Sequence, residues 1–479
     1  MTALPGHLAA GAPGSTERVA VIGGGYAGLA AGMDLADAGL PVTVFEAGPV
    51  LGGRARRIPG GDGHDDNGQH LLIGAYTELL GRMERIGIPL HEVLARRPLT
   101  VRVAGGLQLA AWPLPAPFNL AAGVLLARGV RLRERIASVR ALSDLRSDGF
   151  RARRGETVAA LLDRFELHGT LRTQLWEAIC LAALNTPAER ACAQTFLNIL
   201  HDIATGPRSA SDLLIPRTDL SSLFPEPAAD YIRARGGAVH THATVLRLED
   251  AGDAVRLIGT ERHGLFRRVI VATGSQALPR LLGSWPDMQP LLQRVATLPQ
   301  ERIATLTLEY PCPVRLPFPM MGIAYGAVEW LFDRGWLLDG RPGQPGRISC
   351  VLSAAELGST LDREALTASA HADLQAITGE LPYPVASRLV VEKRATFSCQ
   401  PGLVRPDGIT HDPRIVLAGD YLASRYPATL ETAVRSGRRA AAAVISWTQA
   451  RIPGTGGSEA LPAPEWNPPP SRSRPLSLP

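Results

Sequence analysis

Residues 18–54 read RVAVIGGGYAGLAAGMDLADAGLPVTVFEAGPVLGGR, and this stretch decides the fold. Its first part, Arg18–Ile22, is an unbroken apolar run, which is typical of a parallel strand buried on both faces. Gly23, Gly25 and Gly28 follow in G-x-G-x-x-G spacing. In this motif the first glycine permits a tight turn, the second lets a pyrophosphate approach the backbone, and the third lets a helix pack against the strand.

The residues after the glycines continue the same unit. Small side chains at Ala27, Ala30 and Ala31 predict a helix that lies close to a sheet, and Gly39 is placed to end it. Val42–Phe45 is the next predicted strand. Glu46 at its end is positioned to bind the hydroxyls of an adenosine ribose. This context favours a dinucleotide site over a glycine-rich surface loop.

Composition narrows the class of protein. A chain of 479 residues predicts two or three folded units, and 45% hydrophobic with 20% charged residues is ordinary for a globular enzyme. The net charge is +5, and Lys393 is the only lysine, so the positive charge is almost all arginine. The arginines are scattered and aromatic residues make up only 5%, which excludes a nucleic-acid partner and favours a basic surface that faces anionic lipid.

Cysteine usage and the termini predict a cytoplasmic protein, soluble or attached to the membrane face. The cysteines are odd in number and lack CxxC or Cys/His spacing, so we expect reduced thiols and no metal site. Residues 1–17 do not resemble a signal peptide, and no apolar run reaches the roughly 18 residues of a transmembrane helix. Residues 1–17 and the Pro-rich residues 451–479 are predicted to be disordered.

The order of the remaining segments predicts an α/β fold. Strands are expected at Ala238–His240 and Thr244–Leu248, and buried strands at Arg268–Thr273 and Ile415–Asp420. Alternation between residues 300 and 395 indicates a mixed or antiparallel sheet. We therefore predict a Rossmann-like domain with a parallel sheet, assembled from residues 18–95, 205–290 and 396–450. An α+β substrate domain is inserted as residues 96–204 and 291–395.

The segment from Trp112 has two interpretations. The favoured one is a core helix followed by a solvated helix. The alternative is an interfacial patch, with Trp112, Phe118 and Leu120 in lipid and Arg128, Arg131 and Arg133 on the head groups.

Two further motifs belong with the nucleotide site. Leu51–Ala55, LGGRA, predicts a second glycine turn at Gly53 that brings Arg54 near the phosphates. Near the other end of the chain, Gly419 and Asp420 follow a buried strand, where a carboxylate can accept a cofactor hydroxyl. A helix beginning near Thr429 would aim its positive end at the same site.

These motifs carry a family resemblance. GGGYAGLAAG, VFEA, LGGRA, RVIVATG and IVLAGDYLASRYPATLETAVRSGRRAA resemble the FAD-dependent amine oxidase/phytoene desaturase superfamily. DNGQHLLIGAYTELL and VVEKRATFSCQPGLVRP resemble its squalene-associated branch, the hydroxysqualene dehydroxylases of hopanoid biosynthesis. The resemblance runs from about Arg18 to Ala443. Val50 and Arg57 depart from the superfamily's usual R-x-G-G-R-x-x-S/T turn.

The resemblance implies FAD as cofactor and the reductive removal of an allylic hydroxyl from hydroxysqualene to give squalene. It implies a long apolar tunnel in the inserted domain for this isoprenoid, and a backbone contact from Val245 to the adenine. The other implied FAD contacts are Gly23, Gly25, Gly28, Glu46, Gly53, Arg54, Gly419, Asp420 and Thr429.

The proton donor is left open between several polar residues. Asp66, His70, Tyr421 and Tyr426 are candidates, and for each a purely structural role fits the sequence equally well. Lys393 is interpreted as an ordinary sheet lysine.

Other functions compete with the dehydroxylase. They are an oxidative polyene desaturase of the phytoene type and a flavin-binding subunit without turnover, with amine oxidation least supported. A second dinucleotide fingerprint is missing from the sequence, so we expect no built-in nicotinamide domain and an external, unidentified reductant.

Overall fold

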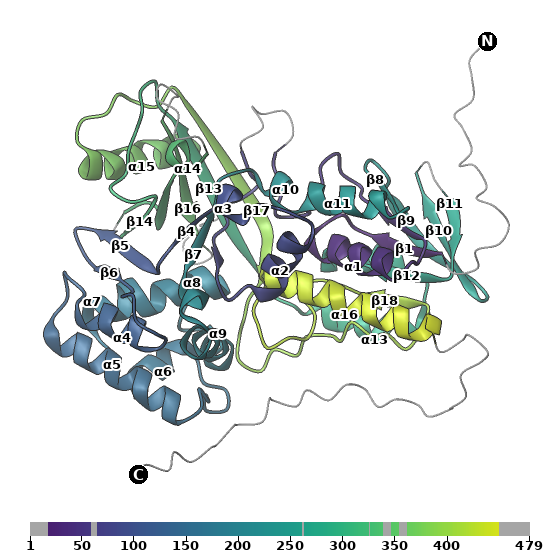
Figure 1. Cartoon of the computed structure of the whole chain (residues 1–479), viewed down its shortest axis with the longest axis horizontal. Coiled ribbons are helices and arrows are strands. Elements are labelled where there is room, and N and C mark those ends of the chain that lie inside the picture. Colours follow the sequence, from purple (N-terminus) through teal and green to yellow (C-terminus); the bar gives the residue numbers. More distant parts are fainter. Residues whose placement is uncertain are drawn as a thin grey trace.

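The computed structural model describes residues 18–58, 65–260, 263–324, 326–338, 346–353 and 362–449. The predicted disordered tails, residues 1–17 and 451–479, lie outside the described residues. One part of the molecule is built around a parallel sheet, on the right of Figure 1, and the other around a mixed sheet and a group of helices, on the left.

The parallel sheet has the strand order β18-β12-β1-β2-β8. Its strands come from three distant parts of the chain, yet they pair in simple register, with Val21 between Val44 and Ile270. The strands are short and mostly apolar, and β1, β12 and β18 are buried along their length, as expected for a sheet covered on both faces. The predicted parallel α/β fold is thereby confirmed. The strands are β1 (Val19–Ile22), β2 (Val42–Phe45), β8 (Ala238–His240), β12 (Arg268–Val271) and β18 (Ile415–Leu417).

Alternate side chains of β1 enter different cores. Val19 and Val21 face a layer of helices, α1 (Tyr26–Asp37), α11 (Pro225–Ala234) and α16 (Leu430–Gln449), which lie together in Figure 1. Ala20 and Ile22 face the opposite side and share a core with a small antiparallel sheet and its helices. That side contains β9 (Val245–Ala251), β10 (Ala254–Gly259), β11 (His263–Phe266), α12 (Leu278–Leu282) and α13 (Gln289–Ala296).

The mixed sheet has the order β17-β13-β16-β15-β14-β5-β6, so the alternating sequence between residues 300 and 395 forms the sheet type that was predicted. Its pairs are antiparallel except for β14 with β5. The helix α15 (Arg363–Thr378) packs on its core. The strands are β5 (Thr100–Ala104), β6 (Gln108–Ala110), β13 (Gln300–Glu309), β14 (Met320–Ile323), β15 (Trp330–Asp333), β16 (Arg347–Leu352) and β17 (Ala386–Phe397).

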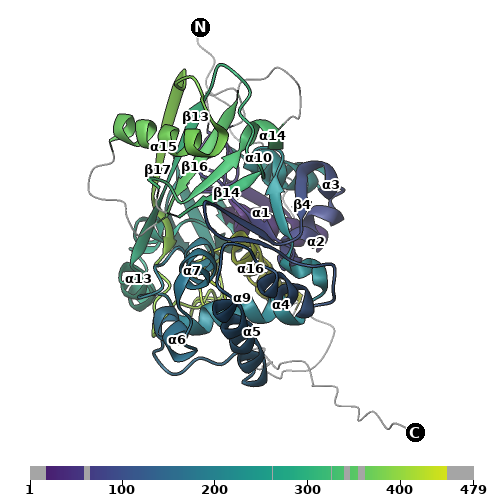
Figure 2. The ribbon, with the colours of Figure 1, turned by 90° about the vertical axis from the view of Figure 1, so that its left-hand side faces the viewer.

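A group of helices lies below the mixed sheet and beside the parallel sheet (Figures 1 and 2). It comprises α4 (Phe118–Leu125), α5 (Leu132–Ser147), α6 (Val158–Arg164), α7 (Gly169–Leu171), a π-helical turn (Arg172–Glu177), α8 (Ala178–Leu184) and α9 (Ala193–Thr205). The connecting elements are α2 (Thr77–Arg85), α3 (Leu90–Val93), α10 (Leu220–Leu223), α14 (Arg334–Leu338), β3 (Leu72–Ile73), β4 (Leu94–Arg97) and β7 (Leu213–Pro216). The division into domains at residues 95, 204, 290 and 395 stays a prediction.

The edge strand β17 carries a β-bulge. Glu301 pairs with Thr396 and Ile303 pairs with Glu392, so residues 393–395 lie opposite Arg302 alone. A bulge bends a strand and re-aims its side chains and carbonyls. Here it lies at the junction of the mixed sheet with the parallel sheet, where the cavity described next is found.

Candidate functional site

A cavity of about 1170 Å³ joins the two parts of the molecule. It opens outside the carboxyl ends of β1, β2, β12 and β18, which is where open parallel sheets bind ligands. From there it extends between the mixed sheet and the helices, where its walls are apolar. A single small-molecule site commonly measures about 300–1,000 Å³, so the volume is large for one ligand. Apolar wall residues include Val124, Leu142, Leu175, Trp176, Ile179, Ile203, Met320 and Phe332.

Two glycine turns form one end of this cavity. Gly23 has φ 113°, and a Cβ there would lie 2.5 Å from the Ala272 carbonyl oxygen. Gly52 has φ 120°, and its N–H donates to the Gly24 carbonyl at 2.9 Å, so the second turn lies directly against the first. The α1 N-terminus begins at this point. Backbone N–H groups at such a helix start suit a pyrophosphate.

Glu46 is held in place at the end of β2. Its Oε2 accepts a hydrogen bond from the Gly24 N–H at 2.8 Å, and its Oε1 accepts one from the Gly48 N–H at 2.7 Å. A carboxylate has about four acceptor positions, so each oxygen keeps capacity for a ligand hydroxyl. This arrangement fits a ribose at the Glu46 side of the cavity.

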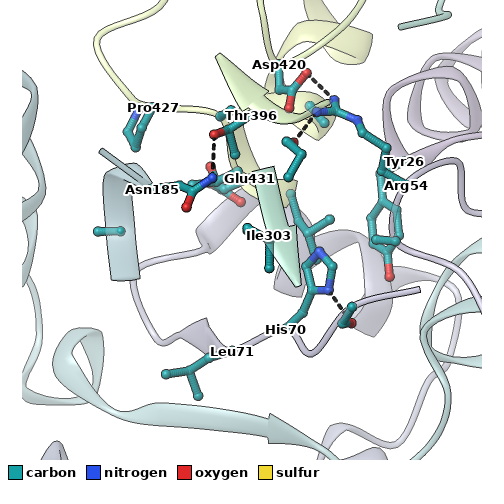
Figure 3. Close-up of a pocket in the computed structure, with 18 of the residues that line it drawn as sticks. Tyr26, Arg54, His70, Leu71, Asn185, Ile303, Thr396, Asp420, Pro427 and Glu431 are labelled. Carbon is teal, nitrogen blue, oxygen red and sulfur yellow. Dashed lines mark hydrogen bonds and ion pairs between the residues drawn. The ribbon is translucent and has the colours of Figure 1, made fainter. Parts of the chain in front are cut away.

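Arg54 connects three segments that are distant in sequence (Figure 3). Its Nη2 lies 2.5 Å from Asp420 Oδ1, and its Nη1 donates to the Ala395 carbonyl in the β17 bulge at 2.5 Å. Burial lowers and the Asp420 carboxylate raises the pKa of Arg54, and the net shift is upward. The guanidinium therefore stays charged on the cavity wall, as a contact to phosphate oxygens requires.

The C-terminal segment supplies a further part of the cavity wall. The Gly419 N–H donates to Ser436 Oγ at 2.5 Å, which fixes the turn that carries Asp420. Thr429 precedes α16, and its Oγ1 accepts from the Thr432 N–H at 3.1 Å. Thr429 also lines the cavity, so the positive end of α16 faces it.

The remaining predicted cofactor residues occupy different places. Val245 lines the cavity, and so does Gly53, at φ 66°. Gly28 is not among the described residues of the wall. A Cβ at Gly28 would lie 2.0 Å from the Gly23 carbonyl oxygen, so this glycine serves the close packing of α1 on the turn.

The candidate proton donors separate into two groups. His70 and Tyr426 line the cavity, whereas Asp66 and Tyr421 are absent from the part of its wall that the structure describes. Asp66 is buried, accepts from the Leu220 N–H at 2.8 Å and lies 3.6 Å from Arg334. Tyr421 is buried against Gly419. The described contacts of Asp66 and Tyr421 are with other parts of the protein, which fits a structural role for both residues.

His70 lines the cavity and is held by a backbone hydrogen bond. Its Nδ1 lies 2.9 Å from the Gly68 carbonyl oxygen, and because a carbonyl only accepts, Nδ1 carries the proton (Figure 3). Nε2 of the neutral ring is then an acceptor. Burial lowers the pKa of His70, which favours this neutral ring at neutral pH. The ring therefore suits a proton acceptor better than the proton donor proposed from the sequence.

Several wall residues were not predicted. Asn185 ends α8 in the left-handed region, at φ 46°, and its Nδ2 donates to Thr396 Oγ1 at 3.0 Å (Figure 3). Lys393 lies on β17, as predicted, and also lines the cavity beside the bulge. The sequence signal was the polar run Glu392–Arg394, which interrupts an otherwise apolar alternation. Asp202 of α9, which contacts Tyr426, gave no signal of this kind.

The fold and the site together define a dinucleotide-binding protein with an apolar chamber beside its cofactor cradle. The chain belongs to the family of flavin containing amine oxidoreductases, whose family model matches residues 26–445. It is therefore an FAD-dependent oxidoreductase, and the glycine turns, Glu46 and the Arg54–Asp420 pair fit that cofactor.

Known proteins resemble the chain over most of its length. A hydroxysqualene dehydroxylase from Rhodopseudomonas palustris is 29% identical, over 90% of this chain and 99% of its own. A zeta-carotene desaturase from Synechocystis is 24% identical, over 91% of this chain and 98% of its own. The solved structure of cyclohexylamine oxidase from Brevibacterium oxydans superposes with a TM-score of 0.60 at 20% identity, covering 91% of this chain and 100% of the other. This structural likeness concerns the fold.

Proposed function

We propose that the chain catalyses the reductive dehydroxylation of hydroxysqualene to squalene. The observation that carries the proposal is the continuity of the 1170 Å³ cavity, which runs from the cofactor cradle into an apolar chamber. A long isoprenoid alcohol has one polar group and a large apolar surface, so it suits such a chamber. The similarity to hydroxysqualene dehydroxylases over nearly the whole chain supports this choice.

In this proposal the chain's residues bind, orient and exclude water. The glycine turns, Glu46 and Arg54 hold the dinucleotide part of FAD, and Asp420 with the α16 N-terminus holds the other part. The apolar wall keeps water from the reacting carbon. The reaction breaks the allylic C–O bond and releases the hydroxyl as water after it gains a proton. It would form a C–H bond with a hydride from bound FAD that an external reductant has first reduced.

An oxidative polyene desaturase is the second candidate, because a zeta-carotene desaturase also matches the chain over most of its length. The same apolar chamber would accept a polyene hydrocarbon. A flavin-binding subunit without turnover is disfavoured, since the Glu46, Arg54 and Asp420 set is complete.

Assays of both reactions distinguish the dehydroxylase from the desaturase. Chemically reduced holoenzyme is given hydroxysqualene, and oxidised holoenzyme with an added electron acceptor is given phytoene. Products are identified by mass spectrometry. We expect squalene in the first reaction and unchanged phytoene in the second. The reverse outcome would replace the dehydroxylase with a desaturase.

We also propose that α4 and α5 contact the surface of an anionic membrane. Within the described residues, no helix combines the length and apolar character that crossing a membrane requires. However, α4, α5 and the segment before them expose a set of large apolar side chains beside exposed arginines, and this combination suits a lipid interface. Leu120, which the interfacial interpretation of the sequence placed in lipid, lines the cavity instead. The exposed apolar set is Trp112, Leu114, Phe118, Leu125, Leu126, Leu132 and Ile136.

A further inference from the structure

A polar cluster joins α9 to the loop that leads into α16. The Tyr426 hydroxyl donates a hydrogen bond to Asp202 Oδ2. Arg425 Nη2 lies 3.1 Å from the other oxygen of Asp202, and Asn198 Nδ2 donates to the Arg425 carbonyl at 2.7 Å. Tyr426 and Asp202 both line the cavity, although neither belongs to the cofactor cradle. The cluster therefore forms part of the cavity wall and is held from both sides.

The cluster lies where the apolar chamber meets the cofactor end. On one side Ile199, Leu200 and Ile203, all of α9, line the chamber. On the other side residues 427–429 continue along the wall to the start of α16. A ligand with a long apolar body and one polar group would have its apolar body against α9 when that group reaches Tyr426.

Hydrogen-bond roles at Tyr426 are fixed by its partner. A phenol has one proton, and a carboxylate accepts that proton but has none to give, so the Tyr426 oxygen offers only lone pairs to the cavity. Burial, then Asp202, raises the pKa of Tyr426 to about 12, so the phenol keeps its proton at neutral pH. The guanidinium groups of Arg425 and Arg435 lie 5.1 and 5.4 Å from the ring centre, within the range of cation–π contacts.

We propose that the Tyr426 oxygen accepts a hydrogen bond from the hydroxyl of the isoprenoid alcohol, and that Asp202 is a positioning residue that keeps the phenol in this acceptor role. The proposal rests on the dehydroxylase function proposed above. It replaces the sequence-based suggestion that Tyr426 donates the proton. A site with an acceptor placed for a hydroxyl discriminates against a ligand without one, so the alcohol binds more tightly than the hydrocarbon product.

Binding of hydroxysqualene and squalene to the oxidised FAD holoenzyme tests this inference. The readout is the change in visible flavin absorbance on titration, under conditions where no turnover occurs. For Tyr426→Phe we expect roughly 5- to 100-fold weaker binding of the alcohol, from the loss of one hydrogen bond, and unchanged binding of squalene. Asp202→Ala should lower the alcohol-to-squalene affinity ratio, and Asp202→Glu, which retains a carboxylate, should recover part of it.

Tyr231→Phe is the matched control. Like Tyr426, Tyr231 donates its hydroxyl proton to an aspartate, Asp37, at 2.8 Å, and an arginine, Arg235, lies over its ring. Tyr231 lies on α11 and is not among the described residues of the cavity wall. The Tyr231→Phe substitution should leave the affinities for hydroxysqualene and for squalene unchanged. If wild type binds the alcohol and Tyr426→Phe binds it equally well, the role of Tyr426 is wrong while the dehydroxylase proposal survives. If wild-type holoenzyme does not bind the alcohol, both proposals fail.

Discussion

The carboxylate of Glu46 stabilises two turns at once, because one oxygen accepts from Gly24 and the other from Gly48. Glu46 therefore shapes the pocket as well as facing the ribose position. Removal of this carboxylate should weaken FAD binding in two ways. The ribose loses a contact, and the turns at Gly24 and Gly48 lose the hydrogen bonds that order them.

We predict that Glu46→Ala weakens FAD binding by roughly 1–3 kcal/mol, the cost of leaving buried polar partners unsatisfied. Titration of apoprotein with FAD, followed by flavin fluorescence, measures this change. Glu84→Ala, an exposed change on α2, is the control and should leave the affinity unchanged. Equal FAD affinity for wild type and Glu46→Ala would remove Glu46 from the site.

Asp66 makes the stability of the fold depend on pH. Burial raises its pKa from the ordinary 3.8 to about 7, against the opposing effect of Arg334. Between these values the folded state binds more protons than the unfolded state, so this contribution to stability falls as pH rises from about 4 to 7 and is constant above.

Urea unfolding of wild type and Asp66→Asn between pH 5 and pH 8 measures that contribution. Asparagine keeps an acceptor for the Leu220 N–H but has no proton to lose. We expect the stability of wild type relative to Asp66→Asn to fall as pH rises to about 7. If the unfolding free energies of wild type and Asp66→Asn changed with pH in parallel, Arg334 would be keeping Asp66 ionised over the whole range.

Among the helices, the pair α1 and α16 determines where the two halves of the cofactor cradle meet. The helices approach so closely that a Cβ at Gly437 would lie 2.1 Å from the Ala27 carbonyl oxygen. Because Thr429 and Asp420 precede α16, any shift of this helix moves the flavin end of the site relative to the glycine turns.

Gly437→Ala should therefore destabilise the protein by about 1–3 kcal/mol, as overpacking does, and also weaken FAD binding. Gly81→Ala is the matched control, since Gly81 lies within α2 with no atom within 4 Å of its Cβ position. That change should be neutral or stabilising by up to about 1 kcal/mol. Denaturant midpoints and FAD titrations compare the two variants, and similar losses in both would contradict tight α1–α16 packing.

Elements with a local signature were predictable, and elements that depend on distant partners were not. The strand β2 and the end of α1 at Gly39 follow from short-range pattern and backbone freedom, and both appear as predicted. The β17 bulge depends on its pairing with β13, so the sequence of β17 gave only the polar run at Glu392–Arg394. Asp202 reaches Tyr426 across 224 residues, and no local pattern reports such a contact.

On the scale of the whole molecule, the helices α4 and α5 are an outer face of the apolar chamber. Val124 of α4 lines the cavity, while Phe118 and Leu126 beside it are 63% and 53% exposed. These exposed side chains support the membrane contact proposed above, since a helix buried in a core would cover them. Exposed arginines, among them Arg128, Arg131 and Arg133, add charge of the sign that anionic lipids attract.

We predict that the protein co-sediments with vesicles containing phosphatidylglycerol and less with pure phosphatidylcholine vesicles, and that salt weakens the binding. The double variant Phe118→Glu/Leu126→Glu should lose most of this binding. Val385→Glu/Val404→Glu changes two equally exposed apolar residues elsewhere and should retain it. Equal binding of both double variants would place the membrane contact outside α4.

In the proposed function, one cavity brings FAD and an isoprenoid alcohol together for reduction of the alcohol. Anaerobic single turnover tests it most directly: photoreduced holoenzyme is mixed with hydroxysqualene while visible flavin absorbance and squalene are both measured. We predict that the absorbance of oxidised flavin returns and that one squalene forms per flavin. Flavin that stays reduced, with no squalene formed, would contradict the account.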